Sequence, residues 1–246
     1  MELFYQSQGE GTPIVFVHGF SLDSQMWQPQ VDGFSKTNQV TTYDMRGFGK
    51  SPTPTGLYSH IEDLHNLVNH LKIQKFHLVG LSLGGEVAID YALTYPNTIR
   101  SLTLADSSLG GYSSPVDWRV YAKEQGLKKA KENWLNHPVF ATAKAKPEIF
   151  SQLKQMVGDY SGWHWLNQDT RTKLNPPAID RLGEIHVPTQ VIVGEKDLDY
   201  YHTIADILAD KIPNSQLEYI SHSGHMVNLE SPKEFNLLIS KFIKSA

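Results

Sequence analysis

Apolar residues along this chain follow two different periods, and segments of the two kinds alternate. Short continuous apolar runs bounded by Gly, Pro or polar residues predict buried strands. Helical spacing of apolar residues in the segments between them predicts helices. Strands alternating with helices indicate an α/β fold, a mostly parallel, doubly wound sheet with helices on both faces. The strands are expected at 14–17, 40–43, 76–79, 99–104, 190–193 and 216–220, with an edge strand at 3–6, and the helices near 60–71, 87–93, 203–211 and 232–243.

The pattern changes between about Ser107 and Glu184. Strand signals vanish there, and helical segments separated by Gly and Pro replace them. Four of the five tryptophans gather in this segment, at Trp118, Trp134, Trp163 and Trp165. The sequence therefore predicts an α/β core formed by residues 1–106 and 185–246, interrupted by a helical insertion at 107–184.

The segment from Gly80 to Gly85 joins a predicted strand directly to a predicted helix. Its sequence, GLSLGG, places Ser82 on a sharp turn between the two elements. The flanking Gly80 and Gly84 suit a backbone too tight for side chains. A serine lifted out of such a turn is exposed, and the start of the helix points N–H groups at the space beside it. Ser82 is therefore the candidate nucleophile.

Composition narrows the classes of function. The chain has 246 residues, 22 basic and 26 acidic residues and a net charge of −4, without a marked Lys/Arg cluster, so nucleic acid is not an expected partner. It has no cysteine, which rules out a thiolate nucleophile and cysteine metal ligands. No apolar run approaches the length of a membrane span, and Met1-Glu2-Leu3 lacks a signal-peptide pattern. A cytoplasmic protein without a membrane partner is expected.

Five motifs in a fixed order resemble those of the α/β-hydrolase fold family over nearly the whole chain. The nucleophile, acid and base also follow in the family's order of Ser, Asp and His. The motifs are His18-Gly19, the loop Asp44-x-Arg46-Gly47-x-Gly49-x-Ser51, Gly80-x-Ser82-x-Gly84, Val193-Gly194-Glu195-Lys196-Asp197 and Gly224-His225. The resemblance implies that the helical insertion is a cap over the carboxyl edge of the sheet, and that the site contains a catalytic triad.

A serine hydroxyl needs a base near neutral pH, and the resemblance identifies that base as His225. His225 follows Gly224 after the last predicted strand, whereas other histidines lie within a helix or a strand. Asp197, after the strand at 190–193, is the expected acid. Asp199 lies close to it in sequence, and Asp106 ends a neighbouring strand where some members of the fold carry the acid, so both remain alternatives.

The resemblance also implies an oxyanion hole formed by the backbone N–H groups of Phe20 and Leu83. His18 is expected to order its loop, and Asp44 and Arg46 are interpreted as loop-ordering charges. His222 and His225 lack a carboxylate or cysteine cluster in sequence, so neither a metal nor a cofactor is expected.

The identity of the nucleophile narrows the reaction. Family members that open epoxides or displace halide use a carboxylate where this chain has Ser82, and those resembling perhydrolases usually carry tryptophan where it has Phe20. Hydrolysis of carboxylic esters of small molecules through an acyl-enzyme is therefore expected. An enol-lactonase or a C–C bond (diketone) hydrolase uses the same triad and stays open. A ligand receptor with little turnover is a further alternative.

Aromatic residues of the insertion suggest what the cap selects. Trp134, Phe140, Trp163 and Trp165 are expected to roof Ser82 and leave a confined apolar pocket, although aromatics could equally bind the cap helices together. The cap has no Lys/Arg cluster, but Arg119 or Arg171 could meet one carboxylate. The preferred substrates are therefore expected to be uncharged esters with short to medium acyl chains.

Overall fold

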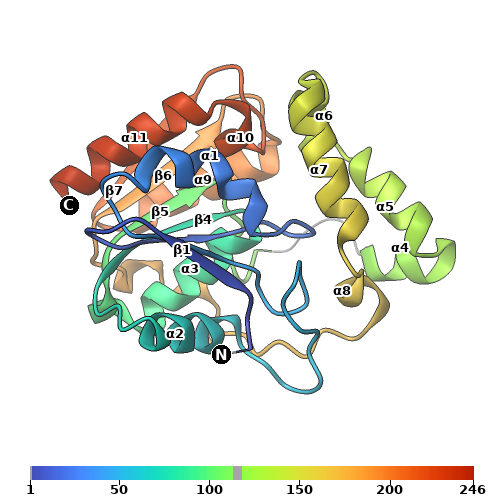
Figure 1. Cartoon of the computed structure of the whole chain (residues 1–246), viewed down its shortest axis with the longest axis horizontal. Coiled ribbons are helices and arrows are strands. Elements are labelled where there is room, and N and C mark those ends of the chain that lie inside the picture. Colours follow the sequence, from blue (N-terminus) through green and yellow to red (C-terminus); the bar gives the residue numbers. More distant parts are fainter. Residues whose placement is uncertain (1, 113–117) are drawn as a thin grey trace.

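The computed structural model describes residues 2–112 and 118–246 and contains a seven-stranded sheet. The strand order is β1-β3-β2-β4-β5-β6-β7, with β1 antiparallel to β3 and all other neighbours parallel. Figure 1 shows the sheet between layers of helices. The strands are β1 (Tyr5–Gln8), β2 (Ile14–Val17), β3 (Val40–Tyr43), β4 (Phe76–Leu81), β5 (Ile99–Ala105), β6 (Thr189–Gly194) and β7 (Ser215–Ile220).

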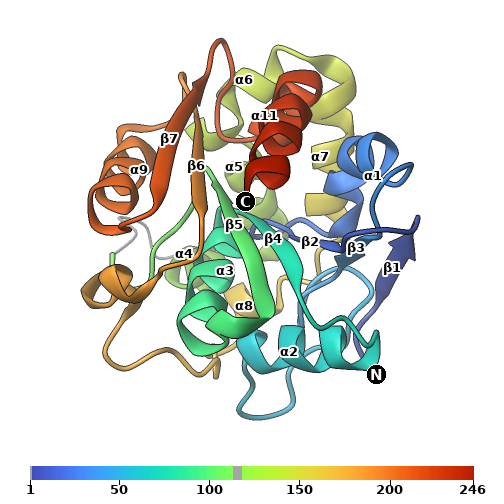
Figure 2. The same cartoon turned by 90° about the vertical axis from the view of Figure 1, so that its left-hand side faces the viewer.

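Successive residues of each buried strand enter two separate hydrophobic cores, because side chains alternate between the faces of a sheet. In β2, Val15 packs into the core under α2 (His60–His70), α3 (Leu83–Thr94) and α9 (Asp199–Lys211). The next residue, Phe16, packs into the core under α1 (Gln28–Phe34) and α11 (Pro232–Ser245). Figure 2 shows α9 and α11 on opposite sides of the sheet. The continuous apolar runs of the sequence reflect this burial on both faces, and the predicted doubly wound α/β fold is confirmed.

The interior strands lie within two residues of their expected positions, and the edge strand is shifted by two residues to Tyr5–Gln8. Helix α9 begins at Asp199, four residues before its expected start. The sequence analysis missed α1, whose sequence QPQVDGF has only two large apolar residues and an internal glycine. Packing of Phe34 into the second core stabilises this helix despite its weak periodicity.

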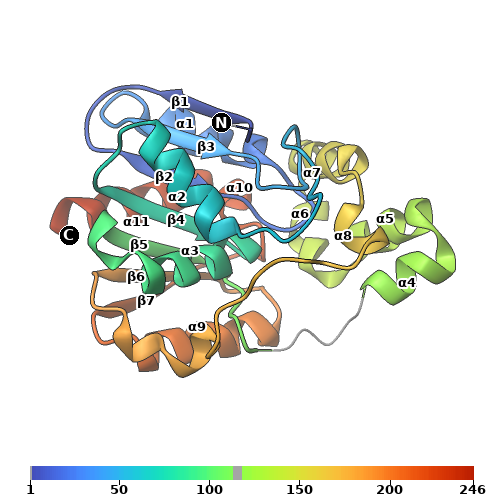
Figure 3. The ribbon, with the colours of Figure 1, turned by 90° about the horizontal axis from the view of Figure 1, so that it is seen from below.

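The helices of the insertion lie beside one end of the core (Figures 1 and 3). Residues 113–117, within the predicted insertion, are outside the described part of the chain. The cap helices are α4 (Trp118–Gln125), α5 (Leu127–Leu135), α6 (Ala141–Lys144), α7 (Pro147–Asp159) and α8 (Trp163–Leu166). The return segment at 178–184 packs against α3 and α9 of the core. The predicted division at residues 107 and 184 stays a prediction.

The carboxyl ends of the parallel strands converge on the edge of the sheet that faces the cap (Figure 3). The residues that follow β2, β4 and β6 include His18, Ser82 and Asp197. An open parallel sheet binds ligands at this edge. Among the helices of the described residues, none combines the length and apolar character needed to cross a membrane.

Candidate active site

Ser82 occupies a strained turn of one residue between β4 and α3. Its backbone angles are φ 55° and ψ −117°, outside the regions that ordinary residues favour. A Cβ on Gly84 would lie 2.1 Å from the carbonyl oxygen of Val17, and a Cβ on Gly80 would lie 2.2 Å from that of Gly84. Other backbone segments approach Gly80 and Gly84 so closely that neither position can hold a residue with a Cβ.

Backbone hydrogen bonds hold this turn in place. The Ser82 N–H donates to the carbonyl of Ala105 at 3.0 Å, and the Ser82 carbonyl accepts from Gly85 and Ser108 at 2.9 and 3.0 Å. Neighbouring parts of the fold thus fix the strained conformation. The serine side chain is directed to the carboxyl edge of the sheet.

Asp197 and His225 form the acid–imidazole pair of the site. His225 Nδ1 lies 2.8 Å from Asp197 Oδ2, and the two side chains are only 3% and 1% exposed. The other carboxylate oxygen of Asp197 accepts a hydrogen bond from the Leu198 N–H at 2.7 Å. Since an ionised carboxylate can only accept, Nδ1 carries the proton and Nε2 is left as the acceptor.

Glu230, which the sequence analysis did not identify, holds the loop that carries His225. Its carboxylate accepts from the N–H of Gly224 at 2.8 Å and from that of Met226 at 3.3 Å. Burial raises the pKa of Glu230, and these two hydrogen bonds oppose that shift. The residues on both sides of His225 therefore donate backbone hydrogen bonds to the same buried carboxylate. No local pattern marks Glu230, since its role depends on a loop folding back over it.

Tyr201, in the first turn of α9, contacts both Ser82 and His225. Its hydroxyl lies close enough to Ser82 for the serine side chain to influence the pKa of the tyrosine, and both residues line the same cavity. Its ring centroid lies 4.0 Å from that of the His225 imidazole. The nucleophile and the base therefore flank one tyrosine side chain. The sequence analysis missed this residue because it expected α9 to begin at residue 203.

The two alternative acids have different surroundings. Asp199 is exposed at the start of α9. Asp106 is buried, and its Oδ1 accepts a hydrogen bond from the Gly194 N–H at 2.8 Å. Burial first, and then the negative charge of Asp197, raise the pKa of Asp106 well above its usual range. Burial therefore favours the protonated form of Asp106, whereas Asp197 makes the contact with His225.

Asp106, Asp197 and His225 form a cluster whose potential ligand atoms lie within 4.8 Å of one another. Three such groups could in principle hold a cation. However, the imidazole nitrogen facing the carboxylates is hydrogen-bonded to Asp197. The raised pKa of Asp106 favours its protonated form, which is a poor metal ligand. The cluster therefore suits proton transfer better than metal binding.

The predicted oxyanion donors lie beside the serine. Leu83 is the first residue of α3, and Phe20 and Leu83 both line the cavity that contains Ser82. The first N–H groups of a helix have no intrahelical partner, so that of Leu83 can serve an oxyanion. His18 Nε2 accepts from the Met45 N–H at 2.9 Å, and its Nδ1–H donates to the Gly19 carbonyl at 2.8 Å. His18 thus orders the loop that carries Phe20.

Another histidine, His164, lines the cavity but lacks the surroundings of a base. Its Nδ1 lies 2.9 Å from the hydroxyl of Tyr160, and its Nε2 lies 3.2 Å from that of Tyr58. Burial lowers the pKa of His164 to about 4. Its ring also stacks on Phe48, with centroids 4.3 Å apart. His164 is therefore a neutral packing residue at the cavity wall.

The cavity has a volume of about 800 Å³ and two unlike sides. Of the four predicted cap residues, Trp134 and Trp165 line it, together with Trp118. Phe140 is fully buried and packs against Trp134, with ring centroids 5.4 Å apart. Trp163 packs against Tyr58, with ring centroids 6.1 Å apart. These two aromatics are not among the described lining residues.

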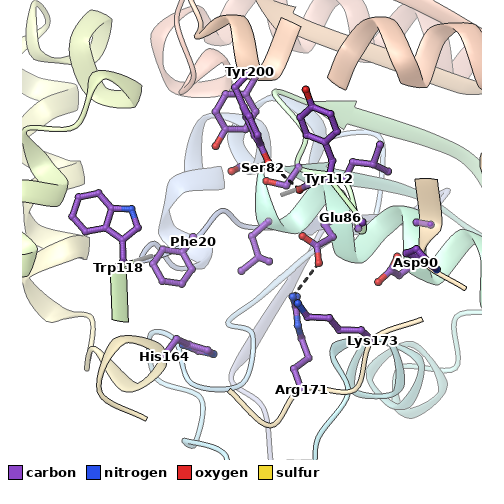
Figure 4. Close-up of a pocket in the computed structure, with 18 of the residues that line it drawn as sticks. Phe20, Ser82, Glu86, Asp90, Tyr112, Trp118, His164, Arg171, Lys173 and Tyr200 are labelled. Atoms are coloured by element: carbon purple, nitrogen blue, oxygen red, sulfur yellow. Dashed lines mark hydrogen bonds and ion pairs between the residues drawn. The ribbon is translucent and has the colours of Figure 1, made fainter. Parts of the chain in front are cut away.

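The other side of the cavity is charged, which the sequence analysis did not predict. Figure 4 shows Phe20, Trp118 and His164 on one side, and Glu86, Arg171, Lys173 and Asp90 on the other. Glu86 and Arg171 form an ion pair of 3.0 Å, with side chains 16% and 12% exposed. Glu86 and Asp90 are one turn apart on α3, whereas Arg171 lies in the non-helical segment that follows α8. The contact between Glu86 and Arg171 therefore depends on the tertiary structure.

Comparison with known proteins agrees with the fold and the motif order. A protein-family model described as "alpha/beta hydrolase fold" matches residues 12–232 of the chain. The chain belongs to the α/β-hydrolase fold family.

Several proteins of this family are similar over most of their length. The chain is 29% identical to monoacylglycerol lipase ABHD6 of Mus musculus, over 96% of this chain and 77% of that one. It is 28% identical to the putative carbamate hydrolase RutD of Agrobacterium fabrum, over 100% and 98%. A solved structure of Est816, described as an N-acyl homoserine lactone degrading enzyme, shares 30% identity with a TM-score of 0.79, over 98% and 96%. These relatives support hydrolase activity.

The charged side of the cavity predicts a pH dependence of stability. Burial, and secondarily the charge of Glu86, raise the pKa of Asp90 to about 7, and Asp90 Oδ1 has no hydrogen-bond partner among the described residues. The folded chain therefore binds this proton more tightly than the unfolded chain. The resulting stability is fully present below about pH 4 and is lost as pH rises through about 7.

Asp90→Asn should remove this dependence. At pH 8 the wild type carries a buried, unpaired charge that the variant lacks. The free energy of unfolding of the variant, relative to that of the wild type, should therefore be about 1–3 kcal/mol higher at pH 8 than at pH 4. Urea unfolding at the two pH values measures the change. Asp210→Asn, on the exposed side of α9, is the matched control. An equal difference between Asp90→Asn and wild type at both pH values would contradict the assignment.

Proposed function

We propose that this protein is a serine hydrolase that cleaves carboxylic esters of small to medium, uncharged substrates through an acyl-enzyme on Ser82. The observation that carries the proposal is the strained Ser82 turn beside the buried Asp197–His225 pair. Hydrolase relatives favour an enzyme over a ligand receptor. A serine nucleophile, a base and an acid that orients the base are the requirements of acyl transfer.

The roles follow from the hydrogen bonds. With the Nδ1 proton directed at Asp197, His225 Nε2 accepts the Ser82 proton as the serine oxygen attacks the ester carbonyl. The N–H groups of Phe20 and Leu83 stabilise the negative carbonyl oxygen of the tetrahedral intermediate. His225 then returns the proton to the departing alcohol, and water hydrolyses the acyl-enzyme by the same steps in reverse.

The cavity supports small, uncharged substrates. Its volume of about 800 Å³ falls within the range of small-molecule sites. The Glu86–Arg171 ion pair already neutralises the arginine, and Lys173 lies on the same side as Asp90, so the charged side carries both signs of charge and offers polar contacts. The aromatic side suits an acyl chain. The activity named for ABHD6, cleavage of monoacylglycerol, is also an ester hydrolysis.

Lactone hydrolysis is a second candidate. The relative with 30% identity, Est816, is described as degrading N-acyl homoserine lactones. Such a substrate combines an apolar acyl chain with a polar ring, and the cavity likewise has an aromatic and a polar side. The same triad opens a lactone, because a lactone is a cyclic ester.

Replacement of the nucleophile provides the first test. Ser82→Ala should reduce kcat by about 10⁵- to 10⁶-fold, because no acyl-enzyme can form. Phenylmethylsulfonyl fluoride should label wild-type Ser82, and the labelled peptide is identified by mass spectrometry. Multiple turnovers by the wild type would also exclude a receptor. Labelling of another serine, or substantial hydrolysis by Ser82→Ala, would refute the proposal.

The two neighbouring acids should respond differently to the same substitution. Asp197→Asn should lower kcat by about 10³- to 10⁴-fold, because the amide no longer selects the imidazole tautomer that accepts the serine proton. Asp106→Asn should have a much milder effect, since the raised pKa of Asp106 already favours its uncharged form and the contact with His225 is made by Asp197. Steady-state rates of the two variants on one ester decide the matter. If Asp106→Asn is the more damaging change, the acid is Asp106.

A substrate panel tests the size and type of substrate. We expect highest kcat/KM on nitrophenyl esters of short to medium acyl length, falling for long chains that exceed the cavity. An N-acyl homoserine lactone, an enol-lactone and a vinylogous diketone belong in the same panel. Fastest turnover of a lactone would favour the second candidate, and preference for the diketone would assign C–C bond hydrolysis instead.

A further inference from the structure

Tyr201 is the polar group that the cavity presents next to Ser82. Tyr201 and Ser82 both line the cavity, whereas His225 is 3% exposed and is not among the described lining residues. The tyrosine ring lies against the imidazole, with centroids 4.0 Å apart and planes inclined by 37°. Tyr201 thus lies between the base and the space into which a product would leave.

The position of Tyr201 is set by the same turn that carries the acid. The Tyr201 N–H donates to the Leu198 carbonyl at 2.8 Å, and the Leu198 N–H donates to Asp197. On its outer side the ring contacts Tyr200, whose centroid lies 4.9 Å away. Tyr200 is in turn tied by its hydroxyl to the Tyr112 carbonyl at 3.3 Å. The Tyr201 hydroxyl is therefore placed by rigid elements.

The chemistry of the two neighbouring hydroxyl groups decides where each can direct its proton. Ser82 must direct its proton at His225 to become a nucleophile. Toward Ser82 Oγ, the Tyr201 hydroxyl can then act only as a donor. Burial raises the pKa of Tyr201, so the hydroxyl keeps its proton at working pH. Once Ser82 Oγ is bonded to the carbonyl carbon in the tetrahedral intermediate, it is a weaker acceptor, and the tyrosine proton is available to the leaving-group oxygen on the same carbon.

We propose that the Tyr201 hydroxyl is a catalytic hydrogen-bond donor to the leaving-group oxygen of the substrate. This role rests on the proposed serine hydrolysis. The oxygen that departs from the tetrahedral carbon must lie near both Ser82 Oγ and His225, and Tyr201 contacts both residues. As the carbon–oxygen bond breaks, His225 supplies the proton to that oxygen, and Tyr201 stabilises the developing negative charge by its hydrogen bond without giving up its own proton.

The dependence of rate on the leaving group tests this role. Tyr201→Phe keeps the ring against His225 and removes only the hydroxyl. The kcat/KM of variant and wild type is measured on esters of one acid with nitrophenol, phenol, trifluoroethanol and ethanol. For the ethyl ester the variant should lose roughly 10- to 100-fold, as for one hydrogen bond to a charged group. For the nitrophenyl ester the loss should be much smaller, since nitrophenolate needs little stabilisation.

The ratio of the ethyl and nitrophenyl rates is independent of the fraction of folded enzyme, so partial misfolding cannot imitate the result. Tyr95→Phe is the matched control. Its hydroxyl donates to Glu62 at 2.7 Å on the exposed surface, and its removal should leave the ratio at the wild-type value. A Tyr201→Phe loss that is equal for all alcohols, or no loss, would overturn the role of Tyr201. That result would leave the proposed hydrolase intact, whereas activity in Ser82→Ala would refute the hydrolase itself.

Discussion

The close approach of three backbone segments at the end of β4 is the constraint on which the candidate site depends. The chain must leave the sheet and enter α3 within one residue, and it does so only because Gly80 and Gly84 have no Cβ to collide with neighbouring carbonyls. The strain falls on Ser82, at φ 55°. Hydrogen bonds to Ala105 and Ser108 hold that conformation. The Ser82 side chain is thus positioned by a closely packed, hydrogen-bonded backbone before any substrate is present.

Two carboxyl groups that follow adjacent strands have different surroundings. Asp106 is buried and its pKa is raised, with one oxygen bonded to the Gly194 N–H. Asp197 contacts the imidazole of His225. The raised pKa of Asp106 favours its protonated form, so Asp197 is the acceptor that faces His225, and a single tautomer is favoured. Glu230 and Tyr201 then restrict the imidazole from the loop side and from the cavity side.

The cavity combines surfaces from distant parts of the chain. Trp134 and Trp165 come from the cap, and the Glu86–Arg171 pair joins a core helix to the segment that returns from the cap. The Trp134 indole N–H also donates to Ser21 on the core at 2.6 Å. Contacts of this kind fix the cap over the carboxyl edge of the sheet. They also give the cavity an apolar side and a polar side, each suited to a different part of an ester.

The sequence by itself determined the order and type of the strands and of most core helices, and the position of Ser82, because strand burial, helix periodicity and the glycine turn are local properties with a fixed period or spacing. It also pointed to Asp197 and His225, through motifs at strand ends. Tertiary structure alone decided which aromatics reach the cavity, Trp134 but not Phe140, and that Tyr201 contacts the nucleophile. These outcomes depend on how segments far apart in the sequence pack against one another, and no local sequence pattern encodes such packing.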